Sequence, residues 1–334
     1  MMIWIVMAAC ISSYGTLKVR GEMWLIFLIG ISALVGCILG AREAARGLPI
    51  PATAQPKGLV AMATWLLLFP VLPGMLGVTA FTWHRGLDST SWVIAGGVLL
   101  ACVLLCVGGS VAILRATGLA RPVDGPLEQT CREMASASGL SVRHVMSMDL
   151  GMANAFAFPW TRDLGFTHMI LTAIDKEELR SVISHELGHL AEGRAVRWKR
   201  LVGLLAIPTI GLAPGAISGG HPLVGLGLFA TYFLISRWAS RHHKQMEIQA
   251  DSHAGECQSG EGVYARALEK IHAAGLIPAV LQPGLPYPNL YDRMTRAGVT
   301  PDFSRPLPPN RILFMIGSGL TAAAFLTLWR WLGV

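Results

Sequence analysis

The feature that most constrains this chain is a series of apolar segments, most of them close to the length of a membrane-spanning helix. A hydrocarbon core about 30 Å thick needs about 20 predominantly apolar residues in a helix. Only 14% of the 334 residues are charged, whereas a soluble domain usually carries about 25%. We therefore predict a multi-pass membrane protein. The candidate spans are residues 1–14, 23–40, 59–83, 92–114, 201–216, 222–235 and 312–331.

Two of these segments, 201–216 and 222–235, are short and lie close together in the chain. We interpret them as a helical hairpin with its tip at residues 217–221. The sequence leaves open whether this hairpin crosses the bilayer or only enters it from one side.

The net charge of +7 comes largely from lysine and arginine residues at the ends of the apolar segments. An excess of these residues marks the cytoplasmic loops of a membrane protein. Lys18, Arg20 and Arg85 fall on the opposite side in this arrangement. No basic stripe is interleaved with aromatic residues, so we do not expect nucleic acid as a partner. The residues assigned to the cytoplasmic side are Arg42, Arg46, Lys57, Arg115, Arg121, Arg194, Arg197, Lys199, Arg200, Arg237, Arg241, Lys244, Arg305 and Arg311.

Two polar segments separate the spans and predict a small α+β domain. In the first, residues 126–138 suit a helix ended by Gly139, and 142–148 and 169–174 suit short strands. Residues 175–193 suit a helix, because Asp175 and Glu178 have the spacing of a capping box. We divide the chain into an N-terminal membrane region with about four spans (1–114), an α+β domain (115–200), the hairpin (201–236), a continuation of that domain (237–311) and a last span (312–334).

The predicted helix at 175–193 contains an HExxH motif, formed by His185, Glu186 and His189. Residues four apart share a helical face, so both imidazoles can bind one ion. Glu186 is rotated about 100° from His185, so it can act as a general base beside the metal without binding it. The alternative is a pair of histidines that only make local hydrogen bonds.

A third ligand for a catalytic zinc is expected elsewhere in the chain, because such an ion usually has three protein ligands and a water. Glu247 and Asp251 are again four residues apart, after the hairpin. We assign Glu247 as the ligand and Asp251 as the hydrogen-bond acceptor that orients a ligand histidine. Without the HExxH motif, we would interpret Glu247 and Asp251 as part of a solvent-exposed helical turn. The competing ligands are His242, His243 and His253.

These motifs together resemble the HtpX and type I CAAX prenyl protease family of integral-membrane zinc metallopeptidases. The matching parts are residues 184–189 (SHELGH), 247–251 (EIQAD) and, upstream, Asn154, Ala155 and Phe156. The resemblance covers about residues 126–294. It implies a mostly α-helical multi-pass membrane protein with a small α+β zincin domain of the gluzincin type, and one Zn²⁺ per chain.

The resemblance also implies roles for further residues. Asn154, Ala155 and Phe156 would form an edge strand that pairs with the substrate backbone, although an ordinary strand end is the alternative. Tyr287 stands where the family usually has histidine, and Arg293 follows six residues later. Both would lie over the metal, where the tyrosine hydroxyl could donate to the oxyanion. The alternative for Tyr287 is a surface ring in a proline-rich loop.

From these observations we predict a membrane-bound zinc endopeptidase of the HtpX type. It would hydrolyse membrane proteins or membrane-associated peptides for quality control, with its active site on the cytoplasmic side of a bacterial inner membrane. One alternative is a CAAX-type protease that processes lipidated or membrane peptides. A second alternative is a zinc-binding membrane sensor or scaffold without proteolytic activity. Its partners would be the lipid bilayer and those substrates.

Overall fold

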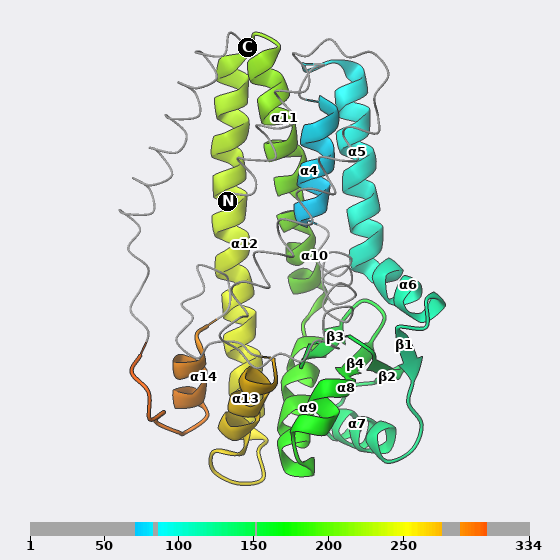
Figure 1. Cartoon of the computed structure of the whole chain (residues 1–334), viewed down its shortest axis with the longest axis vertical. Coiled ribbons are helices and arrows are strands. Elements are labelled where there is room, and N and C mark those ends of the chain that lie inside the picture. Colours follow the sequence, from blue (N-terminus) through cyan, green and yellow to red (C-terminus); the bar gives the residue numbers. More distant parts are fainter. Residues whose placement is uncertain (1–70, 83–85, 151, 276–287, 306–334) are drawn as a thin grey trace, which may run out of the picture.

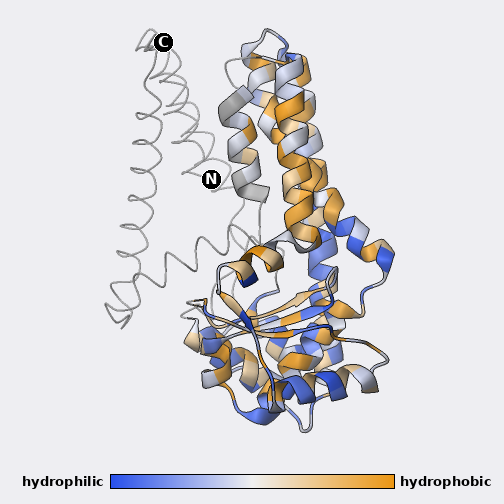
Figure 2. Cartoon of the chain, turned by 90° about the vertical axis from the view of Figure 1, so that its right-hand side faces the viewer, coloured by the Kyte–Doolittle hydropathy of each residue, from blue (hydrophilic) through white to orange (hydrophobic). Residues whose placement is uncertain are grey.

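The described part of the chain folds into a bundle of helices and an α+β half at one end of the bundle (Figure 1). The structure is a computed structural model that describes residues 71–82, 86–150, 152–275 and 288–305. Hydropathy separates the two halves, because the bundle is largely hydrophobic and the other half mixes hydrophobic and hydrophilic residues (Figure 2). This arrangement confirms the predicted fold class, a mostly helical membrane protein with a small α+β domain.

Helices from separate parts of the chain make up the bundle. Within the described residues, three helical stretches are long and apolar enough to cross a membrane, namely Ser89–Ala116, Arg194–Ser218 and Pro222–Glu256. The predicted spans at 1–14, 23–40 and 312–331 lie outside the described residues, as does most of the span at 59–83. The bundle helices are α4 (Val71–Thr82), α5 (Ser89–Leu104), α11 (Ala206–Ser218) and the first part of α12 (Pro222–Glu256).

The stretch Ser89–Ala116 bends where it leaves the bundle. After α5 it continues as a π-helix, η3 (Leu105–Gly109), and then as α6 (Ser110–Ala116). Gly108 has a φ of 138°, which residues with a side chain rarely adopt. A Cβ atom there would lie 2.7 Å from Cγ2 of Thr161. Glycine therefore permits both the bend and the close approach of the turn before β4.

The predicted hairpin is present, and its helices are longer than the apolar segments alone. The first arm runs through α10 (Arg194–Val202), the short 3-10 helix η4 (Gly203–Leu205) and α11. The second arm is α12, with 35 residues. At 1.5 Å per residue, α12 is about 52 Å long, more than the thickness of a hydrocarbon core. Polar helical turns therefore extend the hairpin into the α+β half.

A four-stranded sheet organises the α+β half. Its order is β1-β2-β4-β3, with β2 and β4 parallel and the two outer pairs antiparallel. Alternate residues of β2 point to opposite faces, as a strand requires. Val145 joins the core with α7 and α9, while Met146 and Met148 pack with α6. The strands are β1 (Ala120–Pro122), β2 (Val145–Met148), β3 (Ala155–Phe158) and β4 (Asp163–Thr167).

Within the part of the chain that the structure describes, five further helices surround the sheet and the lower part of α12 (Figure 1). The helix predicted at 126–138 is α7, and Gly139 follows it with a φ of 67°. The capping-box helix predicted at 175–193 is α9. These helices are α7 (Pro126–Ala137), α8 (His168–Ala173), α9 (Lys176–Leu190), α13 (Val263–Ala274) and α14 (Leu290–Arg296).

The strand predicted at 169–174 is wrong, because residues 169–173 belong to helix α8 and Ile174 is its C-cap. The side-chain oxygen of Thr167 caps this helix and accepts a hydrogen bond from the backbone N–H of Ile170. Ile170 is fully buried in the core beside α9. A short apolar run suits a buried strand or one buried helical turn equally well. Thr167, which is also the last residue of β4, caps the segment as a helix.

Candidate metal centre

Helix α9 carries the HExxH motif, and its first turn fixes where the helix begins. Asp175 accepts a hydrogen bond from the backbone N–H of Glu178 at 2.9 Å, and Glu178 accepts one from that of Asp175 at 2.9 Å. Lys270 on α13 pairs with Glu178 at 2.8 Å. Val182, Ile183 and Leu187 are buried in the core beneath the sheet. The helix is thus held along its length, and the motif has a defined orientation.

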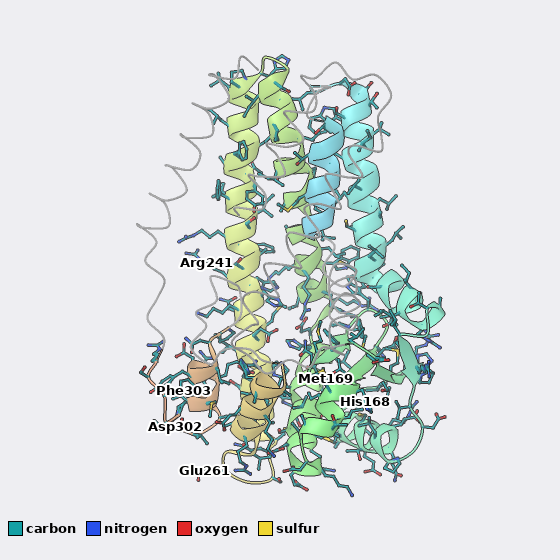
Figure 3. The ribbon with its side chains drawn as sticks, viewed as in Figure 1. His168, Met169, Arg241, Glu261, Asp302 and Phe303 are labelled. Carbon is teal, nitrogen blue, oxygen red and sulfur yellow. The ribbon has the colours of Figure 1, made fainter. Side chains whose placement is uncertain are left out.

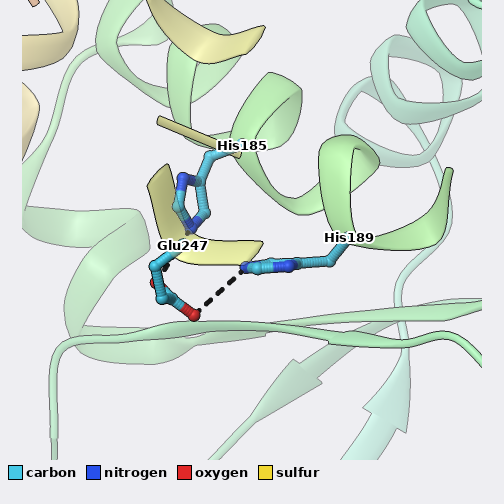
Figure 4. Close-up of side chains that lie close together, drawn as sticks. All are labelled: His185, His189 and Glu247. Carbon is cyan, nitrogen blue, oxygen red and sulfur yellow. Dashed lines mark ion pairs between the residues drawn. The ribbon is translucent and has the colours of Figure 1, made fainter. Parts of the chain in front are cut away.

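Three buried side chains converge where the sequence predicts a metal site (Figure 4). Nε2 of His189 lies 3.4 Å from Oε1 of Glu247, and Nε2 of His185 lies 3.8 Å from Oε2 of the same carboxylate. One ligand atom from each residue lies within 4.8 Å of the others. Tetrahedral zinc with bonds near 2.05 Å places its ligand atoms about 3.3 Å apart. The donor set and its spacing therefore fit zinc.

The competing ligands are placed differently. Within the described residues, the group that could hold a metal consists of His185, His189 and Glu247 and does not include His242, His243 or His253. Nε2 of His243 lies 3.6 Å from Oε1 of Glu247, and the side chain is more exposed than those three. The geometry therefore favours Glu247 as the third ligand.

Glu186 lies beside this group without belonging to it. It is buried and lines the same cleft as the two histidines. Burial raises the pKa of Glu186, although the charges of His185 and His189 oppose the shift. A carboxylate with a raised pKa is a stronger base than an ordinary one, which suits proton transfer near neutral pH.

Behind His185 lies a closed network of hydrogen bonds. The hydroxyl of Tyr264 lies 2.8 Å from Nδ1 of His185 and donates to Asp251 at 2.7 Å. Nδ1 also lies 3.2 Å from Asp251. Arg293 donates to both carboxylate oxygens of Asp251 and to the Tyr264 hydroxyl. Because an acceptor faces Nδ1, the proton of the neutral imidazole lies on Nδ1. The lone pair of Nε2 then points toward the metal site.

Tyr264 was not found from the sequence. It stands on α13, 79 residues from His185 and 13 from Asp251, and no short spacing connects it to either. The sequence analysis assigned the orientation of a ligand histidine to Asp251 and gave no role to Tyr264. Burial raises the pKa of Tyr264 well above the usual range, so its hydroxyl keeps its proton at neutral pH.

A second carboxylate lies behind His189. Oε1 of Glu192 is 3.0 Å from Nδ1 of His189, and Arg200 on α10 donates to the same oxygen. Burial alone would raise the pKa of Glu192, but the hydrogen bond with His189 and the charge of Arg200 outweigh it and lower that pKa. Glu192 is three residues after His189, a spacing that brings side chains together on a helix. That spacing was the available signal for a residue that the sequence analysis missed.

A cleft of about 320 Å³ opens over the metal group. Asn154, Ala155 and Phe156 line it, and β3 is an outer strand of the sheet. The cleft also reaches Gly108 and Leu201, where the α+β half meets the membrane helices. An extended peptide can therefore lie along β3, between the metal group and the end of the bundle.

The two remaining predicted residues have different outcomes. Arg293 lines the cleft, and its guanidinium is bound to the Asp251 carboxylate at 2.7 Å. Its positive charge is thus paired with a carboxylate of the site. Tyr287 lies outside the described residues, so its predicted role stays a prediction.

Comparison with known proteins agrees with this geometry. Residues 123–313 match the family described as Peptidase family M48. Protease HtpX of Hahella chejuensis is 26% identical over 253 residues, which are 64% of this chain and 81% of that protein. Protease HtpX of Acinetobacter baylyi is 23% identical over 254 residues, 64% of this chain and 80% of that protein. The crystal structure of S. mikatae Ste24p has a similar fold, with a TM-score of 0.54 and 16% identity over 89% of this chain and 80% of that one.

Proposed function

Because this chain belongs to peptidase family M48, we propose that it is a zinc endopeptidase in which His185, His189 and Glu247 hold the ion. The family match, the HtpX relatives and the membrane-length helices identify a membrane-bound metalloprotease. The observation that carries the proposal is the convergence of two imidazole nitrogens and one carboxylate beside a buried glutamate.

The substrates follow from the position of the site. An HtpX-like function is favoured over CAAX-type processing and over a non-proteolytic zinc sensor, because the similar curated proteins are HtpX proteases. A membrane-bound protease acts on proteins in or at the bilayer. We propose quality-control cleavage of membrane proteins, because the cleft reaches Gly108 and Leu201 on the membrane helices and the edge of an outer strand selects for backbone more than for side chains.

The chain's own groups divide the reaction between them. The outer edge of β3 at Asn154, Ala155 and Phe156 binds the substrate backbone as an added strand. Glu186 takes a proton from the attacking water and returns it to the amine as the peptide bond breaks. Tyr264 and Asp251 keep Nε2 of His185 free to bind the ion. When bound, zinc supplies the Lewis acidity that activates the water and polarises the carbonyl.

We place the metal-site half in the cytoplasm of a bacterial cell. Basic residues gather where the hairpin helices enter this half, which is the distribution of cytoplasmic ends. Arg241, on α12, lies at this level (Figure 3), and Arg194 lies at the start of α10. A cysteine at the Arg194 position should react with an impermeant maleimide only after cell lysis. Reaction in intact cells would reverse the proposed orientation.

The central experiment separates metal binding from proton transfer. The protein is purified in detergent, and its zinc content is measured together with casein hydrolysis. His185→Ala, His189→Ala and Glu247→Ala should each lose most of the zinc, because two protein ligands rarely hold it. Glu186→Gln should keep about one zinc per chain and lose hydrolysis, since only the base is removed.

Glu177→Gln is a matched control, because Glu177 is an exposed acid on the same helix. It should retain both zinc and activity. Hydrolysis by Glu186→Gln above the level of a chelator-treated sample would contradict the assigned base. Full zinc content in Glu247→Ala would contradict the assigned third ligand.

A further inference from the structure

We propose that Glu192 is the positioning residue that keeps His189 able to bind the metal. It does so by preventing the neighbouring Arg200 from donating a hydrogen bond to the same imidazole. The inference rests on the proposed function, in which His189 is a ligand. It goes further by assigning a role to two residues that take no part in the chemistry described above. The observation behind it is that two groups of opposite character face the same ring nitrogen.

The first group is an acceptor. Oε1 of Glu192 lies 3.0 Å from Nδ1 of His189, and the Glu192 side chain is only 7% exposed. A carboxylate accepts a hydrogen bond, so it favours the tautomer with the proton on Nδ1. The lone pair of Nε2 then faces Glu247 and the metal site.

The second group is a donor. Nη2 of Arg200 lies 3.4 Å from the same Nδ1. A guanidinium has no acceptor, so it can only donate. A hydrogen bond from Arg200 to Nδ1 would use the lone pair there and place the proton on Nε2. Such an imidazole cannot bind zinc through Nε2, so Arg200 alone would favour the wrong tautomer.

Glu192 resolves this conflict by engaging both partners. Arg200 donates to Oε1 of Glu192, the oxygen that also faces His189. The guanidinium is thereby held by the carboxylate and does not compete for the imidazole. The same oxygen thus neutralises the arginine and sets the tautomer of the histidine.

The position of Arg200 is itself fixed. One turn earlier on α10, Arg197 donates to the backbone oxygen of Pro159 at 2.9 Å and lies over the ring of Trp160 at 5.6 Å. These contacts attach α10 to the turn between β3 and β4. Arg200 therefore stays beside His189 when Glu192 is removed, and the effect of that removal depends on the arginine.

The experiment is a double-mutant cycle on the full chain in detergent. Zinc affinity is measured by competition with a chromophoric chelator, and the Co²⁺-substituted protein is examined by visible absorption. Glu192→Ala should weaken zinc binding about 10–100-fold, the usual effect of removing an outer partner of a ligand histidine. Arg200→Ala alone should change the affinity by less than about threefold, because Glu192 still accepts from His189.

The decisive variant is the double substitution. Glu192→Ala with Arg200→Ala should bind zinc more tightly than Glu192→Ala, because the competing donor is gone. Glu192→Gln, which keeps an acceptor oxygen of the same shape, should retain more affinity than Glu192→Ala and a Co²⁺ spectrum close to that of the wild type. A purely structural role would produce neither the recovery nor the preserved spectrum. Arg194→Ala, an exposed arginine at the start of the same helix, is the control and should have no effect.

Three results would overturn the proposal: unchanged affinity in Glu192→Ala, a double variant as weak as or weaker than Glu192→Ala, or equal losses in Glu192→Gln and Glu192→Ala. His189→Ala separates this failure from failure of the proposed function. If His189→Ala keeps its zinc, the ligand assignment itself is wrong. If His189→Ala loses zinc while Glu192→Ala does not, only the positioning role fails.

Discussion

The two histidines of the HExxH motif are four residues apart on one helix, yet different regions of the molecule support them. His185 is backed by Asp251 on α12, Tyr264 on α13 and Arg293 on α14. His189 is backed by Glu192 and Arg200, which come from the end of α9 and from α10. Each side has a carboxylate paired with an arginine, and the His185 side adds the hydroxyl of Tyr264.

The difference lies in how the arginine is placed. Arg293 donates to Asp251 and to the Tyr264 hydroxyl, and a hydroxyl or carboxylate separates it from the imidazole. Arg200 stands 3.4 Å from the ring nitrogen of His189. The His185 side is a closed network in which the Asp251 side chain is 0% exposed, whereas the Arg200 side chain is 29% exposed. We therefore expect the His185 side to contribute mainly to the stability of the fold. On the His189 side we expect zinc affinity to depend more on pH and on neighbouring side chains.

The largest difference should appear when each arginine is removed. Arg293→Ala should lower the free energy of unfolding by about 3–5 kcal/mol, because it leaves Asp251 as a buried charge without its partner. Arg200→Ala should cost about 1 kcal/mol, since this ion pair is partly exposed. Reversible unfolding in detergent mixtures, with chelator present in every sample, measures both. Equal costs for the two variants would remove the proposed contrast.

A smaller effect concerns the proton on His189. Burial alone would lower the pKa of His189, but hydrogen bonds to Glu192 and Glu247 and the nearby carboxylate charges raise it to about 10. An imidazole must lose its proton to bind zinc through Nε2 while Nδ1 keeps its own. The raised pKa means that this proton is present at neutral pH, so apparent zinc affinity should rise by about tenfold per pH unit and level off above about pH 10.

Between pH 7 and 9 this one proton contributes a gain of about 100-fold, or about 2.7 kcal/mol. Calorimetry in two buffers with different ionisation enthalpies would measure the released proton directly. Glu192→Gln should reduce the release at pH 9, because it weakens the hydrogen bond from Glu192 that raises the pKa of His189. A proton release that does not depend on Glu192 would mean that the proton comes from a group other than His189.

The smallest effect is expected for Tyr264→Phe. The ring still packs, but the hydroxyl that contacts Nδ1 of His185 is lost. Asp251 is already 3.2 Å from that nitrogen, so it can replace the hydroxyl as acceptor. We expect zinc affinity to fall by about tenfold, the lower end of the range for an outer partner. A loss as large as that of His185→Ala would mean that Asp251 cannot take over.

The local parts of this site could be predicted from the sequence, because their signals lie within one helix. The capping box at Asp175 and Glu178 and the spacing of His185 and His189 need only helical periodicity. The assignment of Glu247 required a further premise, the number of ligands that catalytic zinc takes.

The outer partners could not be predicted in the same way. Tyr264 reaches His185 because α13 packs against α9, and no sequence period records that packing. Arg200 reaches Glu192 because the chain turns between α9 and α10 at residues 191–193. At 169–174 the choice between strand and helix depended on one cap and one buried isoleucine. In each case the missing information is a tertiary contact.

The unbroken helix α12 also has a mechanical consequence. It runs from Pro222 in the bundle to Glu256, and it carries Glu247 at a distance of about 38 Å from its first residue. A rigid rotation of about 2° around its far end moves a point at that distance by about 1.3 Å. A displacement of about 1 Å at a reacting centre can change a rate about 100-fold. Helices tilt to match the thickness of the bilayer around them, so this lever would make the lipid environment a regulator of Glu247, and hence of cleavage.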